Sequence, residues 1–298
     1  METDPTHQVT SEVKKIMKNR VILSVMFLLF FLTAPYVNGQ AKLKPEEVIE
    51  KHLESIAPAE KRASIKSLIG VGEVRVEYLT QKNQPAVGRM VVASEGNKMF
   101  FGMQLNASDY PQEKVVFDGS KVDVSLVRAG TRSVLGNFIQ SNSRIVSQGL
   151  ISGTLSTSWA LLGAAERGYK VSSGGSKKID GKDVYAINFS PKGSSDLDIT
   201  MFFDQQTFQH VRTEYKRTAS ASMGRTIDES ARQHETRIKF TEDFSDYKNF
   251  EGVNVPTKYR MHYSISGQNG TTEIAWTASF SEFAINQKLD PGTFAVSK

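Results

Sequence analysis

The chain has 298 residues, with 37 Lys and Arg side chains against 32 Asp and Glu side chains, and it contains no cysteine. The lack of cysteine excludes disulfide bonds, thiolate catalysis and Cys-ligated metal sites. The small positive excess is dispersed, without the basic stretches and interleaved aromatic residues of a nucleic-acid groove, so nucleic acid is not expected as a partner.

The N-terminal segment has the order of a secretory signal peptide. A cluster of Lys and Arg precedes an apolar run at 21–33, and small residues follow up to Gly39. The run is shorter than the ~20 apolar residues of a comfortable bilayer span, so we expect export and cleavage between Gly39 and Gln40. A retained signal anchor is the alternative. Met17 opens a compact signal of its own, so either Met1 or Met17 is the start of translation.

Residues 40–298, which follow this N-terminal extension and signal peptide at 1–39, are expected to form a single domain that begins with helices. The segment 45–56 has Pro at its first position, two Glu in its first turn and apolar residues along one face. Pro58 ends this helix, and a second short helix is expected over 59–67.

Most of the remaining chain alternates between apolar and polar residues, which is the pattern of half-buried strands. The clearest alternations lie at 74–78, 98–105, 122–126, 197–204, 253–265 and 273–280. They predict a mainly β protein with some α-helices (α+β), built on one curved antiparallel sheet that has a solvent-exposed polar face and an apolar face. We expect this sheet to form a half-open barrel, with helices covering or plugging its concave face.

Helical spacing returns in an insertion at about 133–165. Its apolar residues form two groups, separated by Gly149 and Gly153, in which helical spacing relates Val134, Leu135, Phe138 and Ile139, and then Leu155, Trp159 and Leu162. An apolar helical insertion within a β chain suits a plug or lid over the sheet. A long polar hairpin loop is expected over 220–230.

The inward strand positions carry more large apolar residues than three or four short helices can cover, so we expect a hydrophobic hollow. The expected lining is Met99, Phe101, Met103, Met201, Phe203, Met261, Tyr263 and Trp276, with Phe138 and Trp159 as lid. Methionine adapts to flexible apolar ligands. A filled core is the alternative interpretation.

Motifs for catalysis or metal binding are weak. Neither HxxxH nor HExxH spacing relates the three later histidines, His210, His234 and His262. His52 is placed on the first helix without a functional role, and no GxSxG elbow occurs. Asp196 and Asp198 share a strand face as paired acids of a glycosidase do, but acids on strand edges more often serve solubility. We therefore expect no enzyme activity, no cofactor and no metal.

Four stretches of the chain carry a family resemblance: 45–56 with 65–68, 180–185 with 189–192 and 203–204, 247–256, and 289–294. Together they resemble the outer-membrane lipoprotein-sorting proteins of the LolA/LolB-like superfamily. The resemblance implies an unclosed antiparallel barrel, lidded by helices, that shields lipoprotein acyl chains in the periplasm.

The sequence thus predicts a periplasmic or otherwise extracytoplasmic, non-enzymatic carrier or binding protein. Its expected partners are lipoprotein acyl chains or another hydrophobic ligand, with only transient membrane contact. The alternative is an envelope protein-interaction module, a stress sensor or assembly scaffold with the same fold, which would need an exposed apolar patch or sheet edge.

Overall fold

The structure is a computed structural model, and the residues it describes are 43–163, 167–193, 195–220, 235–268 and 270–296. The predictions for the signal peptide, for Gly39 and Gln40, for His234 and for most of the 220–230 loop lie outside the described residues. Lys44–Lys298 forms one compact unit. Within the described ranges, no helix is both long enough and apolar enough to cross a membrane.

The described part of the chain contains twelve strands. They are β1 (Ser67–Tyr78), β2 (Ala86–Glu95), β3 (Lys98–Leu105), β4 (Gln112–Phe117), β5 (Val122–Val124), β6 (Lys170–Ile179), β7 (Lys182–Ser190), β8 (Asp198–Asp204), β9 (His210–Ala219), β10 (Thr236–Phe250), β11 (Val253–Gly267) and β12 (Gly270–Ile285).

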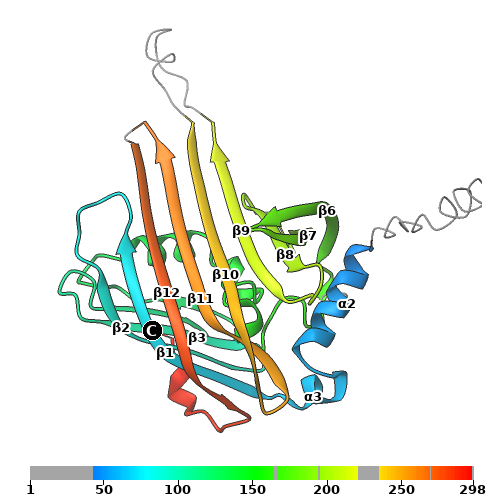
Figure 1. Ribbon diagram of the computed structural model, residues 1–298. Helices are drawn as coiled ribbons and strands as arrows, with labels where there is room; N and C mark the ends of the chain where they lie inside the picture. The colour runs from blue at the N-terminus through cyan, green and yellow to red at the C-terminus, as the bar shows by residue number, and fades with distance from the viewer. Residues whose placement is uncertain (1–42, 164–166, 194, 221–234, 269, 297–298) are drawn as a thin grey trace, which may run out of the picture. The chain divides into compact units, whose positions relative to one another are not determined.

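All twelve strands belong to one antiparallel sheet, in the order β5-β4-β3-β2-β1-β12-β11-β10-β9-β8-β7-β6 (Figure 1). Two meanders, β1–β5 and β6–β12, meet where β1 pairs with β12. The short β5 and the polar β6 are the two edges of this order, so the sheet is open. The predicted fold class, an open and curved antiparallel sheet accompanied by helices, is confirmed.

Local irregularities accompany the bending of the sheet. Register shifts interrupt three strand pairs, at Val71/Gly72, at Ser173/Gly175 and at Phe202/Phe203. Such bulges bend a strand and increase its twist. At Gly72 the neighbouring strand comes so near that a Cβ atom would lie 2.2 Å from the Ser279 oxygen. Glycine is therefore the residue that permits this close approach.

Helix α2 (Pro45–Ile56) has the predicted bounds. Its start is stabilised by the Glu47 carboxylate, which accepts a hydrogen bond from the Lys44 backbone N–H at 2.7 Å. Helix α3 (Ala59–Ser64) is shorter than the predicted 59–67, because β1 begins at Ser67 and takes up the end of that segment.

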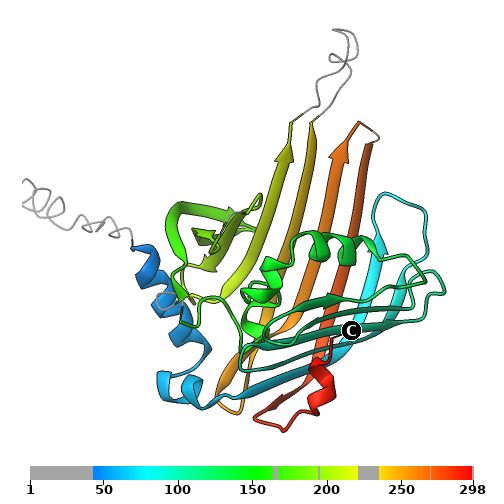
Figure 2. The same ribbon diagram turned by 180° about the vertical axis from the view of Figure 1, so that it is seen from behind.

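The insertion contains α4 (Val134–Ser141), α5 (Arg144–Ser147) and the 3₁₀ turn η2 (Gly153–Leu155). A second 3₁₀ turn, η3 (Pro291–Phe294), lies near the C-terminus. Seen from behind, the helices of the insertion lie over the face of β10–β12 that is hidden in Figure 1 (Figure 2).

The helix predicted from the spacing of residues 155–162 is wrong. After η2 the backbone turns instead, because side-chain hydroxyl oxygens accept hydrogen bonds from backbone N–H groups that would bond to carbonyl oxygens in a helix. Thr157 N–H donates to Ser94 Oγ at 2.9 Å and Ser158 N–H donates to Ser156 Oγ at 3.1 Å. The apolar spacing reflects burial of this segment, not helical geometry.

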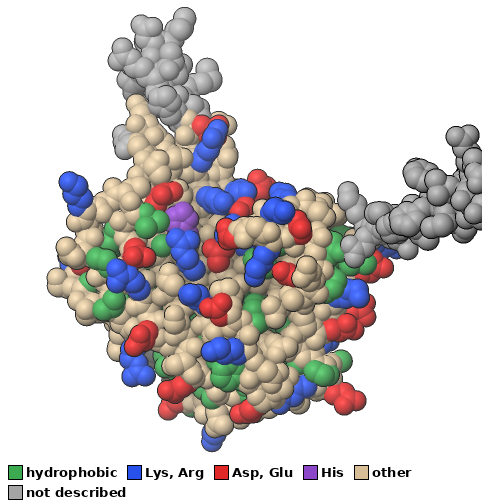
Figure 3. Space-filling view, in the orientation of Figure 1, with side chains coloured by type: hydrophobic (Ala, Val, Ile, Leu, Met, Phe, Trp, Pro, Cys, Tyr) green, Lys and Arg blue, Asp and Glu red, His purple; other side chains and the backbone are tan. Residues whose placement is uncertain are grey.

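The core lies between the concave face of the sheet and the insertion. For example, the Phe138 ring of α4 lies 4.9 Å from the Phe240 ring and 5.7 Å from the Tyr263 ring, centroid to centroid. A smaller apolar cluster joins β6, β7 and β8 through Ile179, Val184, Ala186 and Phe202. The face in Figure 3 carries interspersed positive and negative side chains, as the composition suggested.

Candidate functional site

The ten residues predicted to line or cover a hollow all lie in the core. Each is at most 7% exposed: Met99, Phe101, Met103, Met201, Phe203, Met261, Tyr263, Trp276, Phe138 and Trp159. The structure therefore buries all ten residues, and Phe138 and Trp159 belong to the insertion itself. Their contact with a ligand stays a prediction, and Trp159 is the member that also lines the cavity described next.

A cavity of about 570 Å³ lies between α2 and α3 on one side and the segment after η2 on the other. This volume falls within the roughly 300–1,000 Å³ of small-molecule sites. The lining residues are mostly apolar; they are Leu53, Ile56, Ala59, Arg62, Ala63, Ile65, Leu68, Thr154, Ser156, Thr157, Trp159, Leu162, Gly163 and Val253. We call this space the α2–α3 cavity.

One wall of the α2–α3 cavity is held by a buried aromatic cluster. Trp159 Nε1–H donates to His52 Nε2 at 3.2 Å, and His52 Nδ1 is 2.9 Å from the Phe208 carbonyl oxygen. Since Nε2 accepts, Nδ1 carries the proton. Burial lowers the pKa of His52 to about 4, so the ring is neutral at pH 7, as this bonding requires.

His210 of strand β9 packs against Trp159 and does not itself line the cavity. Its ring stacks on Trp159 with centroids 4.9 Å apart, and its Nε2 is 2.9 Å from Thr213 Oγ1. Burial lowers its pKa well below the usual value. The sequence placed neither His52 nor His210 in a site. A signal existed for His52, which lies four residues after Val48 and four before Ile56 on the buried face of α2.

Arg62 of α3 is the one charged residue among the lining residues. Its Nη1 donates to the carbonyl oxygens of Leu53 at 2.8 Å and Ala57 at 2.5 Å, at the C-terminal end of α2. The Leu53 oxygen also accepts from the Ala57 backbone N–H at 3.4 Å. This positive charge also contributes to the low pKa of His52, after burial.

A buried carboxyl group, Glu242 of β10, attaches the middle of the insertion to the sheet. It accepts hydrogen bonds from Tyr215 Oη at 2.6 Å, from Tyr259 Oη at 2.5 Å and from the Ser152 backbone N–H at 2.8 Å. Burial raises its pKa to about 7, although these three donors oppose the rise. The anchor is thus set to change charge near neutral pH.

A second buried carboxyl group, Glu113 of β4, holds the start of the insertion. It accepts hydrogen bonds from Tyr110 Oη at 2.6 Å and from Ser133 Oγ. Ser133 is also the N-cap of α4, since its Oγ accepts from the Gly136 N–H at 2.7 Å. Burial raises the pKa of Glu113. The insertion is therefore attached to the inner face of the sheet at two acidic points.

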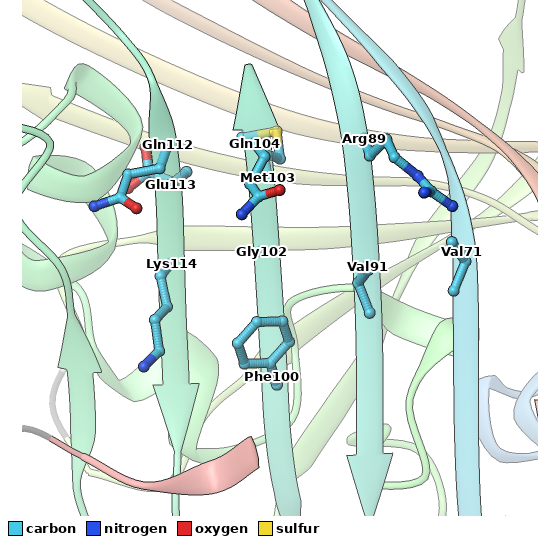
Figure 4. A pocket seen from close by; sticks show the side chains of 10 residues that line it. All are labelled: Val71, Arg89, Val91, Phe100, Gly102, Met103, Gln104, Gln112, Glu113 and Lys114. Atoms are coloured by element: carbon cyan, nitrogen blue, oxygen red, sulfur yellow. The ribbon is translucent and has the colours of Figure 1, made fainter. Parts of the chain in front are cut away.

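A second hollow, of about 480 Å³, lies on the outer face of β1–β4 (Figure 4). Val71, Val91 and Phe100 contribute apolar surface there, and the Phe100 ring covers Gly102, where a Cβ atom would lie 2.7 Å from it. Phe100 is the residue that interrupts the polar alternation of this strand in the sequence. Two cations, Arg89 and Lys114, also line this hollow.

The other residues considered from the sequence line neither of the two hollows described above. Asp196 and Asp198 are exposed. His262 is partly buried, with its Nε2 4.0 Å from Glu273 Oε1. Throughout the described ranges, no three His, Asp or Glu side chains are grouped so that they could hold a metal ion.

Comparison with known proteins gives structural likeness only. No protein-family model matches the sequence, and no curated protein matches it. A LolA superfamily protein from Nitrosomonas europaea is similar in structure, with 14% identity, 85% of this chain and 98% of that chain covered, and a TM-score of 0.45. A putative outer membrane lipoprotein-sorting protein domain from Vibrio parahaemolyticus is also similar in structure. Its identity is 13%, 83% of this chain and 97% of that chain are covered, and the TM-score is 0.41.

A DUF1329 family protein from Desulfovibrio piger is similar to the same degree, with 10% identity, 84% of this chain and 96% of that chain covered, and a TM-score of 0.44. Two of these three structures bear the name of the family that the sequence resembles. At such identities no ligand is transferred, and the site is argued from this chain's own geometry.

Proposed function

We propose that this chain is an extracytoplasmic, non-enzymatic protein that binds an apolar ligand such as an acyl chain in the α2–α3 cavity. The observation that carries the proposal is the cavity itself: nine of its fourteen lining residues are apolar, and its volume is about 570 Å³. Burial of each methylene contributes roughly 0.8 kcal/mol, so an alkyl chain binds there without many polar contacts.

Two features of the site support a binding role. The Trp159 wall is held by hydrogen bonds to His52 and by stacking on His210, so it is shaped before a ligand arrives. The opposite wall is the short α3 helix, of which no residue is fully buried. A rigid wall facing a lightly packed helix is suited to ligands of variable shape.

The proposal is tested by placing a charge in the cavity. Leu162→Lys puts an ammonium group among the lining residues, whereas Leu79→Lys puts the same group at a 49% exposed leucine that does not line the cavity. We expect Leu162→Lys to weaken binding of a pyrene-labelled fatty acid at least tenfold and Leu79→Lys to change it less than twofold. Equal binding by both variants and the parent protein would count against this cavity.

The outer-face hollow favours the second candidate, an envelope protein-interaction module. An outer sheet face is normally polar, yet Val71, Val91 and Phe100 are only partly buried there. Native mass spectrometry of the protein purified from its own cells separates the two candidates. A bound lipid mass supports the binding protein, and a clean unliganded mass supports the module.

A further inference from the structure

We propose that the α2–α3 cavity selects amphiphiles with an anionic head group, and that Arg62 is the residue that binds this group. The inference rests on the proposed function, because it names the ligand class of the same cavity. It goes further in assigning one side chain to ligand discrimination.

The first argument is charge. None of the fourteen lining residues is acidic, so Arg62 is not balanced by a carboxylate in the cavity wall. Its hydrogen-bond partners are two backbone carbonyl oxygens, and within the described ranges it forms no ion pair. Arg62 is partly buried beside an apolar wall, so an anion placed next to it is favoured.

The second argument is geometry. The two carbonyl oxygens of Leu53 and Ala57 hold Nη1 of Arg62, which fixes the plane of the guanidinium group. A guanidinium group has five N–H donors in a rigid fork. The donors on Nη2 and Nε therefore remain for a planar, two-point contact with a carboxylate or phosphate oxygen pair. Because the arginine is already positioned, little side-chain entropy is lost when the head group binds.

The third argument is the position of the charge relative to the apolar wall. Arg62 and Trp159 both line the α2–α3 cavity, and Leu162 lines it as well. The cation and the aromatic wall therefore border one space. A ligand that satisfies both has an alkyl chain against Trp159 and Leu162 and an anionic head at Arg62. This is the chemistry of a fatty acid or of an alkyl phosphate, and it excludes a neutral lipid as the preferred ligand.

The test compares ligands that share a chain and differ in the head: laurate, dodecyl phosphate and 1-dodecanol, measured by displacement of a fluorescent probe. We expect the parent protein to bind laurate or dodecyl phosphate at least tenfold more tightly than dodecanol. Arg62→Gln should bring the ratio of anion affinity to dodecanol affinity down to about one, whatever its effect on dodecanol binding itself. Lys61→Gln, which removes a charge from the adjacent residue, should leave the preference in place. The tighter of the two anions identifies the head group.

The outcomes separate two kinds of failure. If the parent protein binds laurate, dodecyl phosphate and dodecanol equally, the role of Arg62 is refuted and the apolar cavity stands. If it binds none of them, the proposed function fails as well. A purely structural role of Arg62 would weaken anion and alcohol binding alike in Arg62→Gln.

Should Arg62→Gln fail to fold, Arg62→Lys retains the charge and is expected to keep part of the anion preference. For the unmodified protein, raising NaCl from 50 to 500 mM should weaken laurate binding and not dodecanol binding. An anion preference that salt leaves unchanged, or that Arg62→Lys abolishes while retaining dodecanol binding at the parent level, would overturn the assignment as firmly as the glutamine variant could.

Discussion

Replacing the buried anchor Glu242 by glutamine should change how the stability of the protein depends on pH. Glutamine keeps the shape of the side chain and cannot ionise. Its amide oxygen can accept from the Ser152 N–H and Tyr259 Oη, and its amide nitrogen can donate to Tyr215 Oη, which then donates to the Leu150 carbonyl oxygen 3.2 Å away. The insertion therefore stays attached in the variant.

The magnitude follows from the pKa. Burial raises the pKa of Glu242 from 4.5 to about 7. Between pH 4.5 and about 7, the folded protein therefore keeps a proton that the unfolded chain has lost. The stabilisation of the protonated form is complete below pH 4.5 and is lost as pH rises through about 7. At 1.36 kcal/mol per pH unit, the loss amounts to roughly 3 kcal/mol of unfolding free energy.

The assay is urea unfolding at pH values from 4.5 to 8, followed by fluorescence of Trp159 and Trp276. The quantity to compare is the difference in unfolding free energy between the parent protein and Glu242→Gln. This difference removes the opposite contribution of His52, whose lowered pKa makes the protein more stable as pH rises.

As pH rises from 4.5 to 8, we expect the parent protein to lose about 3 kcal/mol of unfolding free energy relative to Glu242→Gln. Glu282→Gln, at an exposed position of β12, is the control and should follow the parent at every pH. A difference that stays constant within about 0.5 kcal/mol would refute the reasoning, since it would mean that Glu242 ionises in the folded protein as it does in the unfolded chain.

Three further substitutions test the packing around the insertion, each read from urea midpoints. Trp159→Phe leaves the buried His52 Nε2 without its donor, and we expect a loss of about 1–3 kcal/mol; an unchanged midpoint contradicts this bond. Gly149→Ala places a Cβ atom 1.8 Å from a backbone oxygen at a φ of 71°, and should cost more than Gly130→Ala, where φ is 74° and the space is open. Equal losses would mean that the clash relaxes freely. Ser133→Ala removes both the N-cap of α4 and a hydrogen bond to the buried Glu113, and should cost about 1–3 kcal/mol; no change would show that neither bond stabilises the fold.

Helix α2 and the alternating strands could be predicted because their signals are local. Pro45, the first-turn acids and the apolar face determine α2 within one segment, and period-two burial is a property of each strand by itself. The same reasoning over-extended in the insertion. There the apolar spacing around Trp159 indicated burial correctly. This segment does not form a helix, because hydroxyl groups such as that of Ser156 accept hydrogen bonds from the backbone N–H groups.

The candidate site was only partly within reach of the sequence. Trp159 was selected as a lid residue, and it does line the cavity. Glu242 lies in phase with the buried Phe240 and Phe244, and Glu113 with Val115, so an acid at an inward strand position was a signal available from the alternation. The pairing of Arg62 with Leu53 and Ala57 had no such signal, because it depends on how two helices meet.

Composition, strand alternation and the local signals of α2 were enough to determine an open antiparallel sheet with helices on its apolar side. The sequence could not determine whether that side is hollow or filled, because this depends on where the insertion packs in the folded protein. The structure places the insertion on the concave face, attached through Glu113 and Glu242. The α2–α3 cavity therefore lies beside the insertion, between it and the helices α2 and α3.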